Sequence, residues 1–138
     1  MINVLFACVH NAGRSQIAAA LFNQYADPAK ARAMSAGTRP ADRVHAEVVI
    51  AMRNRGIDLA SHTPQRLTPE LAADADWLIT MGCGDECPVV PGTQRDDWPI
   101  LDPKGQAPST VDAIIGDIDR RVRKFVESNR LSHSAAAR

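Results

Sequence analysis

Apolar residues along this chain alternate between short continuous runs and stretches in which they recur every three or four positions. Residues 2–7 and 77–81 are largely apolar runs, which are typical of buried strands. Residues 31–36 and 95–98 are weaker strand candidates. Helical patterns separate these runs, and strands that alternate with helices form parallel sheets covered on both faces. The pattern therefore predicts an α/β fold with a four-stranded parallel sheet and helices on both faces.

The helical stretches have recognisable starts and ends. Three of them cover about residues 14–26, 44–52 and 109–128. Asp27-Pro28 ends the first helix, because the residue before a proline avoids the helical conformation. Ser109 is a suitable N-cap for the last and longest helix, and Thr68-Pro69 predicts the cap and first position of a short fourth helix.

Length and composition indicate a single globular domain. The chain has 138 residues, of which 45% are hydrophobic and 23% charged, so it can bury a core without disulfide or metal support. We expect one domain over residues 1–130. Residues 131–138 are mostly small and polar, and we expect them to form a disordered tail.

Charge and hydropathy restrict the partners. Sixteen basic residues balance sixteen acidic ones, so no net charge attracts nucleic acid or an anionic membrane. No apolar run approaches the roughly 20 residues of a membrane span. Residues 1–6 also lack the cationic region of a signal peptide. We therefore expect a cytoplasmic protein. Any preference for anions must come from a local group of residues rather than from the net charge.

The segment from Cys8 to Ser15 has the form Cys, five residues, Arg, Ser, and joins the first predicted strand to the first predicted helix. A loop wrapped at a helix N-terminus points backbone N–H groups inward, and the helix dipole adds positive potential. Such a loop binds a tetrahedral oxyanion. Arg14 can hold two oxygens of that anion. The residues expected around the anion are Val9, His10, Asn11, Ala12, Gly13 and Arg14.

The same positive field predicts that Cys8 is a reactive nucleophile. A helix N-terminus stabilises a thiolate, and Ser15 is placed to donate a hydrogen bond to the sulfur. The alternative is that Cys8 is a small buried apolar residue at a strand end. We interpret His10 as part of the loop scaffold rather than as a general base. Asn11 is expected to hold the loop shape through a left-handed backbone.

Three further candidates follow predicted strands. Cys83 and Cys87 come after the third strand and Asp102 after the fourth. Ligands of a parallel sheet bind beyond the carboxyl ends of its strands, so Cys8, Cys83 and Asp102 are expected at one rim. Thiols in a reducing compartment are more often catalytic, redox-active or buried than structurally bridged. Cysteines four residues apart on a helical turn can also form a disulfide with each other.

These features resemble the low-molecular-weight tyrosine phosphatase superfamily, which has a flavodoxin-like fold. The resemblance rests on the loop from Cys8 to Ser15, on residues 35–38 and on Asp102-Pro103, and it extends to about residue 125. Within the superfamily, the same loop and residues 81–88 are similar to the arsenate reductase branch. The phosphatase branch commonly carries tyrosines beside its Asp-Pro pair, whereas Tyr25 is the only tyrosine here.

The resemblance implies a role for each matching residue. Cys8 would be the nucleophile, Arg14 the oxyanion ligand, Ser15 the donor to the thiolate and Asp102 the general acid that protonates the leaving oxygen. The alternative for Asp102 is an ordinary Asp-Pro turn. Some thioredoxin-linked reductases of this branch hold a potassium ion with an acid in the first helix. Ala19 stands near that position, so we predict no metal site.

The resemblance also implies a reaction. Arsenate would be converted to arsenite through an arseno-thioester on Cys8, with phosphate or sulfate as competing oxyanions. Cys83 would attack Cys8, Cys87 would attack Cys83, and thioredoxin would reduce the resulting surface disulfide. The protein would need an external thiol reductant and no tightly bound cofactor.

Several alternatives fit parts of the same pattern. An external low-molecular-weight thiol such as mycothiol, followed by a glutaredoxin-like protein, could resolve the Cys8 adduct instead. A phosphatase would need no second thiol, and an oxyanion-binding regulatory module would need no reactive thiol. Cys83 and Cys87 lack the second ligand pair of a structural zinc site, whereas two inert buried thiols fit the sequence.

Overall fold

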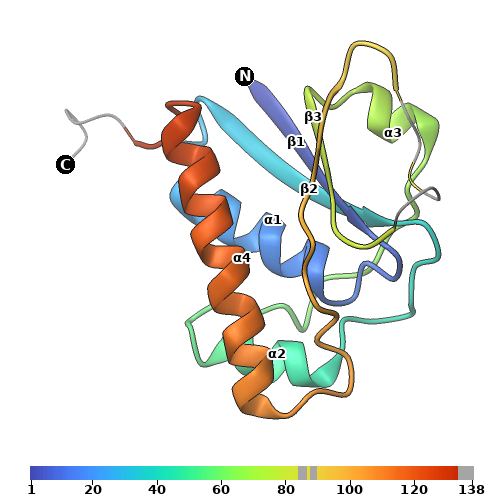
Figure 1. The fold of residues 1–138 in the computed structure, drawn as a ribbon, viewed down its shortest axis with the longest axis vertical. Helices are drawn as coiled ribbons and strands as arrows, with labels where there is room; N and C mark the ends of the chain where they lie inside the picture. The colour runs from blue at the N-terminus through green and yellow to red at the C-terminus, as the bar shows by residue number, and fades with distance from the viewer. Residues whose placement is uncertain (84–86, 88–89, 134–138) are drawn as a thin grey trace.

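One parallel sheet organises the molecule (Figure 1). The computed structural model describes residues 1–83, 87 and 90–133. The strands are β1 (Ile2–Cys8), β2 (Ala31–Gly37), β3 (Trp77–Thr80) and β4 (Gln94–Asp97). They pair in the order β2-β1-β3-β4, and all neighbours are parallel. The predicted four-stranded parallel sheet is confirmed.

Helices cover both faces of the sheet, as predicted. They are α1 (Arg14–Tyr25), α2 (Ala46–Arg53), α3 (Pro69–Ala73) and α4 (Pro108–Ser128). α1 contacts both β1 and β2 as well as α4, and α2 packs against α4. α3 contributes to an apolar cluster on the opposite face. Its predicted cap is formed, because Thr68 Oγ1 accepts a hydrogen bond from the Leu71 N–H at 3.1 Å.

β1 contributes to the core on both sides, because successive side chains of a strand point to opposite faces. Val4, Phe6 and Cys8 belong to the larger apolar cluster, which α1, α2 and α4 complete. Leu5 and Ala7 belong to a smaller cluster with residues of α3. The second face therefore has a thinner cover than the first.

Two predictions about the C-terminal part are wrong in detail. The long helix begins at Pro108 with Ala107 as its N-cap, and Ser109 is an exposed residue of the first turn. Proline suits this first helical position because its fixed φ is helical. Order also continues past residue 130, because the Leu131 side chain is buried and Ser132 pairs with Ala26. Residues 134–138 of the expected tail lie outside the described residues.

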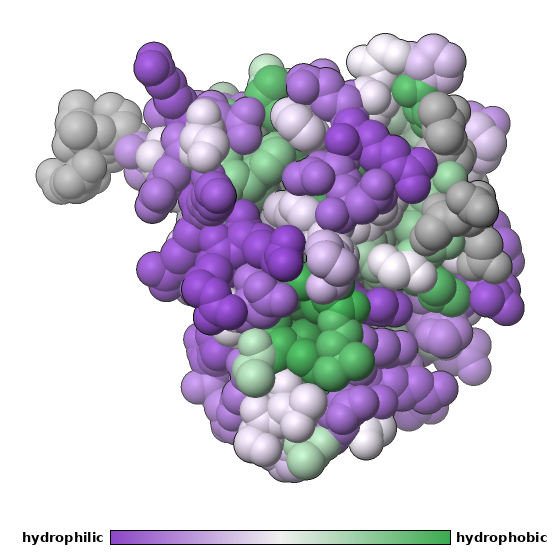
Figure 2. All heavy atoms as spheres, viewed as in Figure 1, coloured by the Kyte–Doolittle hydropathy of each residue, from purple (hydrophilic) through white to green (hydrophobic). Residues whose placement is uncertain are grey.

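α4 forms an outer layer of the fold and is strongly amphipathic. Its buried residues are Val111, Ile114, Ile115, Ile118, Val122, Phe125 and Val126. Figure 2 shows the face over this helix as largely hydrophilic, with a compact hydrophobic patch lower in the view. Among the described residues, no helix combines the length and apolar character needed to cross a membrane.

Candidate active site

The loop between β1 and α1 is held from outside through its carbonyl groups. The carbonyls of Cys8, Val9, His10 and Ala12 accept hydrogen bonds of 2.8–3.2 Å from the N–H groups of Thr38, Arg39, Ala41 and His45, respectively. In a trans peptide the N–H points away from the preceding carbonyl. The N–H groups of residues 9, 10, 11 and 13 therefore point away from the 38–45 segment. This geometry, at the start of α1, is what the predicted oxyanion loop requires.

Gly37 leaves room for this loop. It ends β2 beside Cys8 in the sheet register. A Cβ atom at Gly37 would lie 2.6 Å from the backbone oxygen of Val9 and 2.9 Å from the backbone nitrogen of Asn11. Neither atom can move without moving the loop, so only glycine allows this close approach.

Gly37→Ala is therefore expected to destabilise the fold by about 1–3 kcal/mol, the usual cost of overpacking, and to weaken oxyanion binding. Urea unfolding and protection of Cys8 from alkylation by phosphate measure the two effects. Gly116→Ala is the control, because a Cβ there meets only the Arg120 side chain at 3.7 Å. Equal stability of both variants, with phosphate protection intact, would contradict this role of Gly37.

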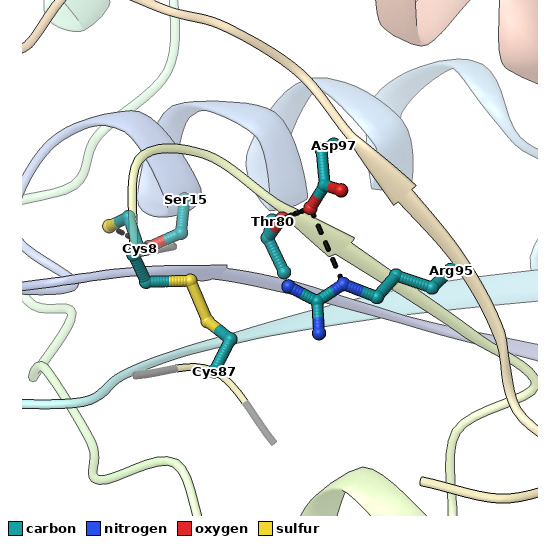
Figure 3. Close-up of a disulfide and its surroundings, with 7 residues drawn as sticks. Cys8, Ser15, Thr80, Cys87, Arg95 and Asp97 are labelled. Atoms are coloured by element: carbon teal, nitrogen blue, oxygen red, sulfur yellow. Dashed lines mark hydrogen bonds and ion pairs between the residues drawn. A yellow bond between two sulfur atoms is a disulfide. The ribbon is translucent and has the colours of Figure 1, made fainter. Parts of the chain in front are cut away.

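Asn11 connects the loop to the nucleophile. Its φ of 50° lies in the left-handed region, as predicted. Asn11 Oδ1 accepts a hydrogen bond from the Gln65 backbone N–H at 3.0 Å, and Asn11 Nδ2 lies 2.7 Å from Ser15 Oγ. Ser15 Oγ lies 2.8 Å from Cys8 Sγ (Figure 3).

The direction of these hydrogen bonds follows from the backbone. An N–H can only donate, so the atom of Asn11 that faces Gln65 is the oxygen, and the atom that faces Ser15 is the amide nitrogen. Ser15 Oγ then accepts from Asn11 and keeps its own proton to donate. A Cys8 thiolate can only accept, so Ser15 donates the hydrogen bond to it. The predicted Ser15–Cys8 contact is thus present, with the polarity that stabilises a thiolate.

Arg14 lies between two other loops at the same rim. Its Nη1 donates to the Ile100 carbonyl at 3.2 Å, and its Nη2 is 3.8 Å from Asp102 Oδ2. Gly82, with a φ of +86°, lies against the guanidinium, where a Cβ would be 2.3 Å from Nη1. The Arg14 side chain is only 11% exposed. The structure thus brings the loops after β1, β3 and β4 together, as the topology predicted.

Asp102 is both a turn residue and a neighbour of the arginine. Its Oδ1 accepts a hydrogen bond from the Lys104 N–H at 3.0 Å, which leaves Oδ2 on the side of Arg14. Pro103 packs against Gly13, where a Cβ would lie 2.9 Å from the proline ring. The Asp102 side chain is 41% exposed, so its carboxyl can meet a ligand in the loop.

His45 borders the site, and the sequence did not indicate it. Its backbone N–H holds the Ala12 carbonyl, and its ring lies 6.4 Å from the His10 ring. Burial lowers the pKa of His45, although the Glu47 and Asp102 carboxylates act in the opposite direction. A lowered pKa keeps this imidazole neutral near pH 7. Gln65 was missed as well, because its contribution comes from the backbone and no side-chain motif marks it.

Cys83 and Cys87 form a disulfide with a Cα–Cα distance of 5.7 Å, so the pairing allowed by their spacing is present (Figure 3). The expectation of a surface disulfide is wrong, because the residues are only 5% and 3% exposed. They are buried with Leu5, Ala7 and other members of the smaller apolar cluster. Residues 84–86, 88 and 89 of this stretch lie outside the described residues. Cys8 is a free, buried thiol.

The end of β3, directly before this stretch, is anchored to β4. The buried Thr80 side chain hydrogen-bonds to Asp97, whose carboxylate also pairs with Arg95 at 3.4 Å (Figure 3). The Met81 N–H donates to the Ala7 carbonyl at 2.7 Å. The backbone is therefore held next to β1 up to Met81, two residues before Cys83.

Comparison with known proteins agrees with this site. The family model for low molecular weight phosphotyrosine protein phosphatase matches residues 3–135. A Halobacterium salinarum protein assigned as an arsenate reductase is 36% identical over 121 residues, which is 85% of each chain. The glutaredoxin arsenate reductase of Synechocystis sp. is 31% identical over 129 residues, covering 91% of this chain and 97% of the relative.

A solved structure gives the same result in three dimensions. The thioredoxin-dependent arsenate reductase of Corynebacterium glutamicum superposes with a TM-score of 0.81 and 41% identity. The match covers 96% of this chain and 64% of that longer one. The chain belongs to the low molecular weight phosphotyrosine protein phosphatase family and, within it, to the arsenate reductases.

Proposed function

We propose that this protein reduces arsenate to arsenite. The observation that carries the proposal is the combination of a thiol at an oxyanion loop with a disulfide-bonded cysteine pair after the neighbouring strand. Cys8 Sγ lies 2.8 Å from Ser15 Oγ, and the Cys83–Cys87 disulfide follows the neighbouring strand. A phosphatase uses the first feature alone, whereas reduction of arsenic also needs the second.

The first step forms the adduct. Arsenate binds to the N–H groups of residues 9–13 and to Arg14, which turns from the Ile100 carbonyl to the anion. Cys8 Sγ attacks arsenic, and Asp102 protonates the oxygen that leaves as water.

The second step transfers two electrons. The Cys83 thiolate attacks Cys8 Sγ, the pair of electrons of the S–As bond moves to arsenic, and arsenite leaves. Cys87 then attacks Cys83, which releases Cys8 and forms the disulfide of this structure. Two thiols are oxidised for each arsenate reduced, so an external dithiol must reduce the pair after every turnover. No resident cofactor enters this scheme.

We propose thioredoxin as that dithiol and the cytoplasm as the location, since a reducing compartment keeps Cys8, Cys83 and Cys87 available as thiols. The thioredoxin-dependent relative from Corynebacterium supports this choice. The relative named a glutaredoxin arsenate reductase supports a second candidate, in which a small thiol attacks the Cys8 adduct and a glutaredoxin-like protein completes the reaction. Phosphate and sulfate are proposed as competing anions.

Arsenite production by the purified, reduced protein tests the function. Thioredoxin with its reductase is supplied in one reaction, and mycothiol with a glutaredoxin-like protein in another. We expect multiple turnovers with thioredoxin and none with Cys8→Ser. Turnover only with the small thiol would show that the small thiol and a glutaredoxin-like protein, rather than thioredoxin, complete the reaction. Phosphate-ester hydrolysis without arsenite formation would mean that the protein is a phosphatase and not an arsenate reductase.

A separate prediction concerns the nucleophile alone. Cys8 is expected to react with iodoacetamide near neutral pH faster than a free thiol. Phosphate or arsenate at about ten times its Kd is expected to slow the reaction about tenfold, because an occupied loop covers the sulfur. Peptide mass spectrometry identifies the alkylated residue. Slow alkylation without anion protection would mean that Cys8 is only a buried apolar residue.

A further inference from the structure

Gln16 is a buried polar residue that the proposed reaction does not use. It belongs to the first turn of α1, and its side chain is directed to the interior, with the residue only 4% exposed. Gln16 Nε2 donates to Asn11 Oδ1 at 3.3 Å. Burying a side-chain amide lowers the stability of the fold unless its hydrogen bonds compensate for the lost contacts with water. The contact with Asn11 therefore needs a structural or functional explanation.

Asn11 Oδ1 therefore receives two donors. One is the Gln65 backbone N–H, which any residue except proline would supply, and the other is Gln16 Nε2. Both act on the same oxygen and hold the Asn11 amide in one orientation. In that orientation Asn11 Nδ2 faces Ser15 Oγ, and the Ser15 hydroxyl keeps its proton to donate to a Cys8 thiolate.

The opposite orientation would reverse this chain of hydrogen bonds. If the Asn11 amide rotated by half a turn, its oxygen would face Ser15 and would accept the Ser15 proton. Cys8 Sγ would then lose its hydroxyl donor, and the thiolate would lose the stabilisation that a charge-assisted hydrogen bond provides. Each donor to Asn11 Oδ1 disfavours this rotation.

We propose that Gln16 is a positioning residue that acts through Asn11 and Ser15 to increase the thiolate fraction of Cys8. The inference deepens the proposed function by adding a residue to the same site. Gln16 touches no reacting atom. Its effect reaches the sulfur in three hydrogen-bonded steps, all between buried side chains.

The test measures the pH midpoint of Cys8 alkylation by iodoacetamide in the oxidised protein, where Cys83 and Cys87 are bridged and Cys8 is free. Gln16→Met keeps the side-chain length and removes the donor. We expect its midpoint to rise by about half a pH unit, which corresponds to a roughly threefold lower rate below the midpoint. Gln16→Leu should behave in the same way, and Gln24→Met, an exposed position of the same helix, should not shift.

A double variant separates positioning from a general structural effect. Ser15→Ala removes the hydroxyl that links Asn11 to Cys8. In that background Gln16→Met should therefore cause no further shift of the alkylation midpoint. An unchanged midpoint in Gln16→Met would overturn the inference, even if the variant has a lower free energy of unfolding. The same shift of the midpoint in the wild-type and Ser15→Ala backgrounds would also overturn it. Alkylation needs no arsenate. A wild-type protein that makes no arsenite but shows the shift would therefore disprove the proposed function and leave this inference intact.

Discussion

Cys87→Ser is expected to release one arsenite per molecule and then stop, with a disulfide between Cys8 and Cys83. Without the Cys87 thiolate, nothing in the chain resolves that bond. Cys83→Ser should stop earlier, with arsenate held on Cys8 and little arsenite released. Both variants should lose multiple turnover with thioredoxin. A single-turnover arsenite assay, combined with mass spectrometry of the cross-linked peptide, measures the difference.

The structure makes this order of attack reasonable. Met81 is hydrogen-bonded to the end of β1, and Cys83 follows after Gly82, whose φ of +86° suits a glycine turn. Cys83 therefore starts close to the strand that ends in Cys8. In the oxidised state both sulfurs are buried on the thinly covered face of the sheet, so a protein reductant reaches them only after local opening.

The externally resolved mechanism gives the opposite pattern. Both serine variants would keep near wild-type turnover with a small thiol and a glutaredoxin-like protein, and a mixed disulfide would form on Cys8. If wild-type protein also shows no Cys83–Cys87 bridge after a turnover, the internal relay is wrong. The roles of Cys8, Arg14 and Asp102 would be unaffected.

Asp102→Asn is expected to slow formation of the Cys8 adduct by about 100-fold or more, the usual effect of losing a general acid. The asparagine can keep the hydrogen bond from the Lys104 N–H, so the turn should survive. Arg14 retains the Ile100 carbonyl as a partner, and oxyanion affinity should change little. Rapid-quench measurement of the adduct gives the rate, and phosphate protection of Cys8 gives the affinity.

Asp112→Asn is the matched control, because it removes the same charge from an exposed position of α4. It should leave both the rate and the affinity unchanged. A loss of oxyanion affinity in Asp102→Asn, with a normal rate once the site is saturated, would make Asp102 a structural residue of the Asp-Pro turn.

The sequence alone was sufficient for the elements and for the local part of the site. Continuous apolar runs predicted β1 and β3, since a strand buried on both faces leaves that pattern, whereas β2 and β4 coincide with the two weaker candidates at residues 31–36 and 95–98. The loop from Cys8 to Ser15 could be recognised because its chemistry lies within eight consecutive residues at a strand–helix junction. The expected rim of Cys8, Cys83 and Asp102 followed from topology, since parallel strands end at one edge.

The tertiary structure decided which way the hydrogen bonds run and which groups are buried. The donor that orients Asn11 is a backbone N–H 54 residues away, and a backbone group leaves no signal in side-chain patterns. The disulfide was expected at the surface because a protein partner would reduce it, but it is buried in one apolar cluster with Leu5 and Ala7 of β1. The close approach of Gly37 and the place of His45 likewise depend on distant segments. Sequence patterns report local periodicity and motifs, whereas these features arise from contacts that exist only after the chain has folded.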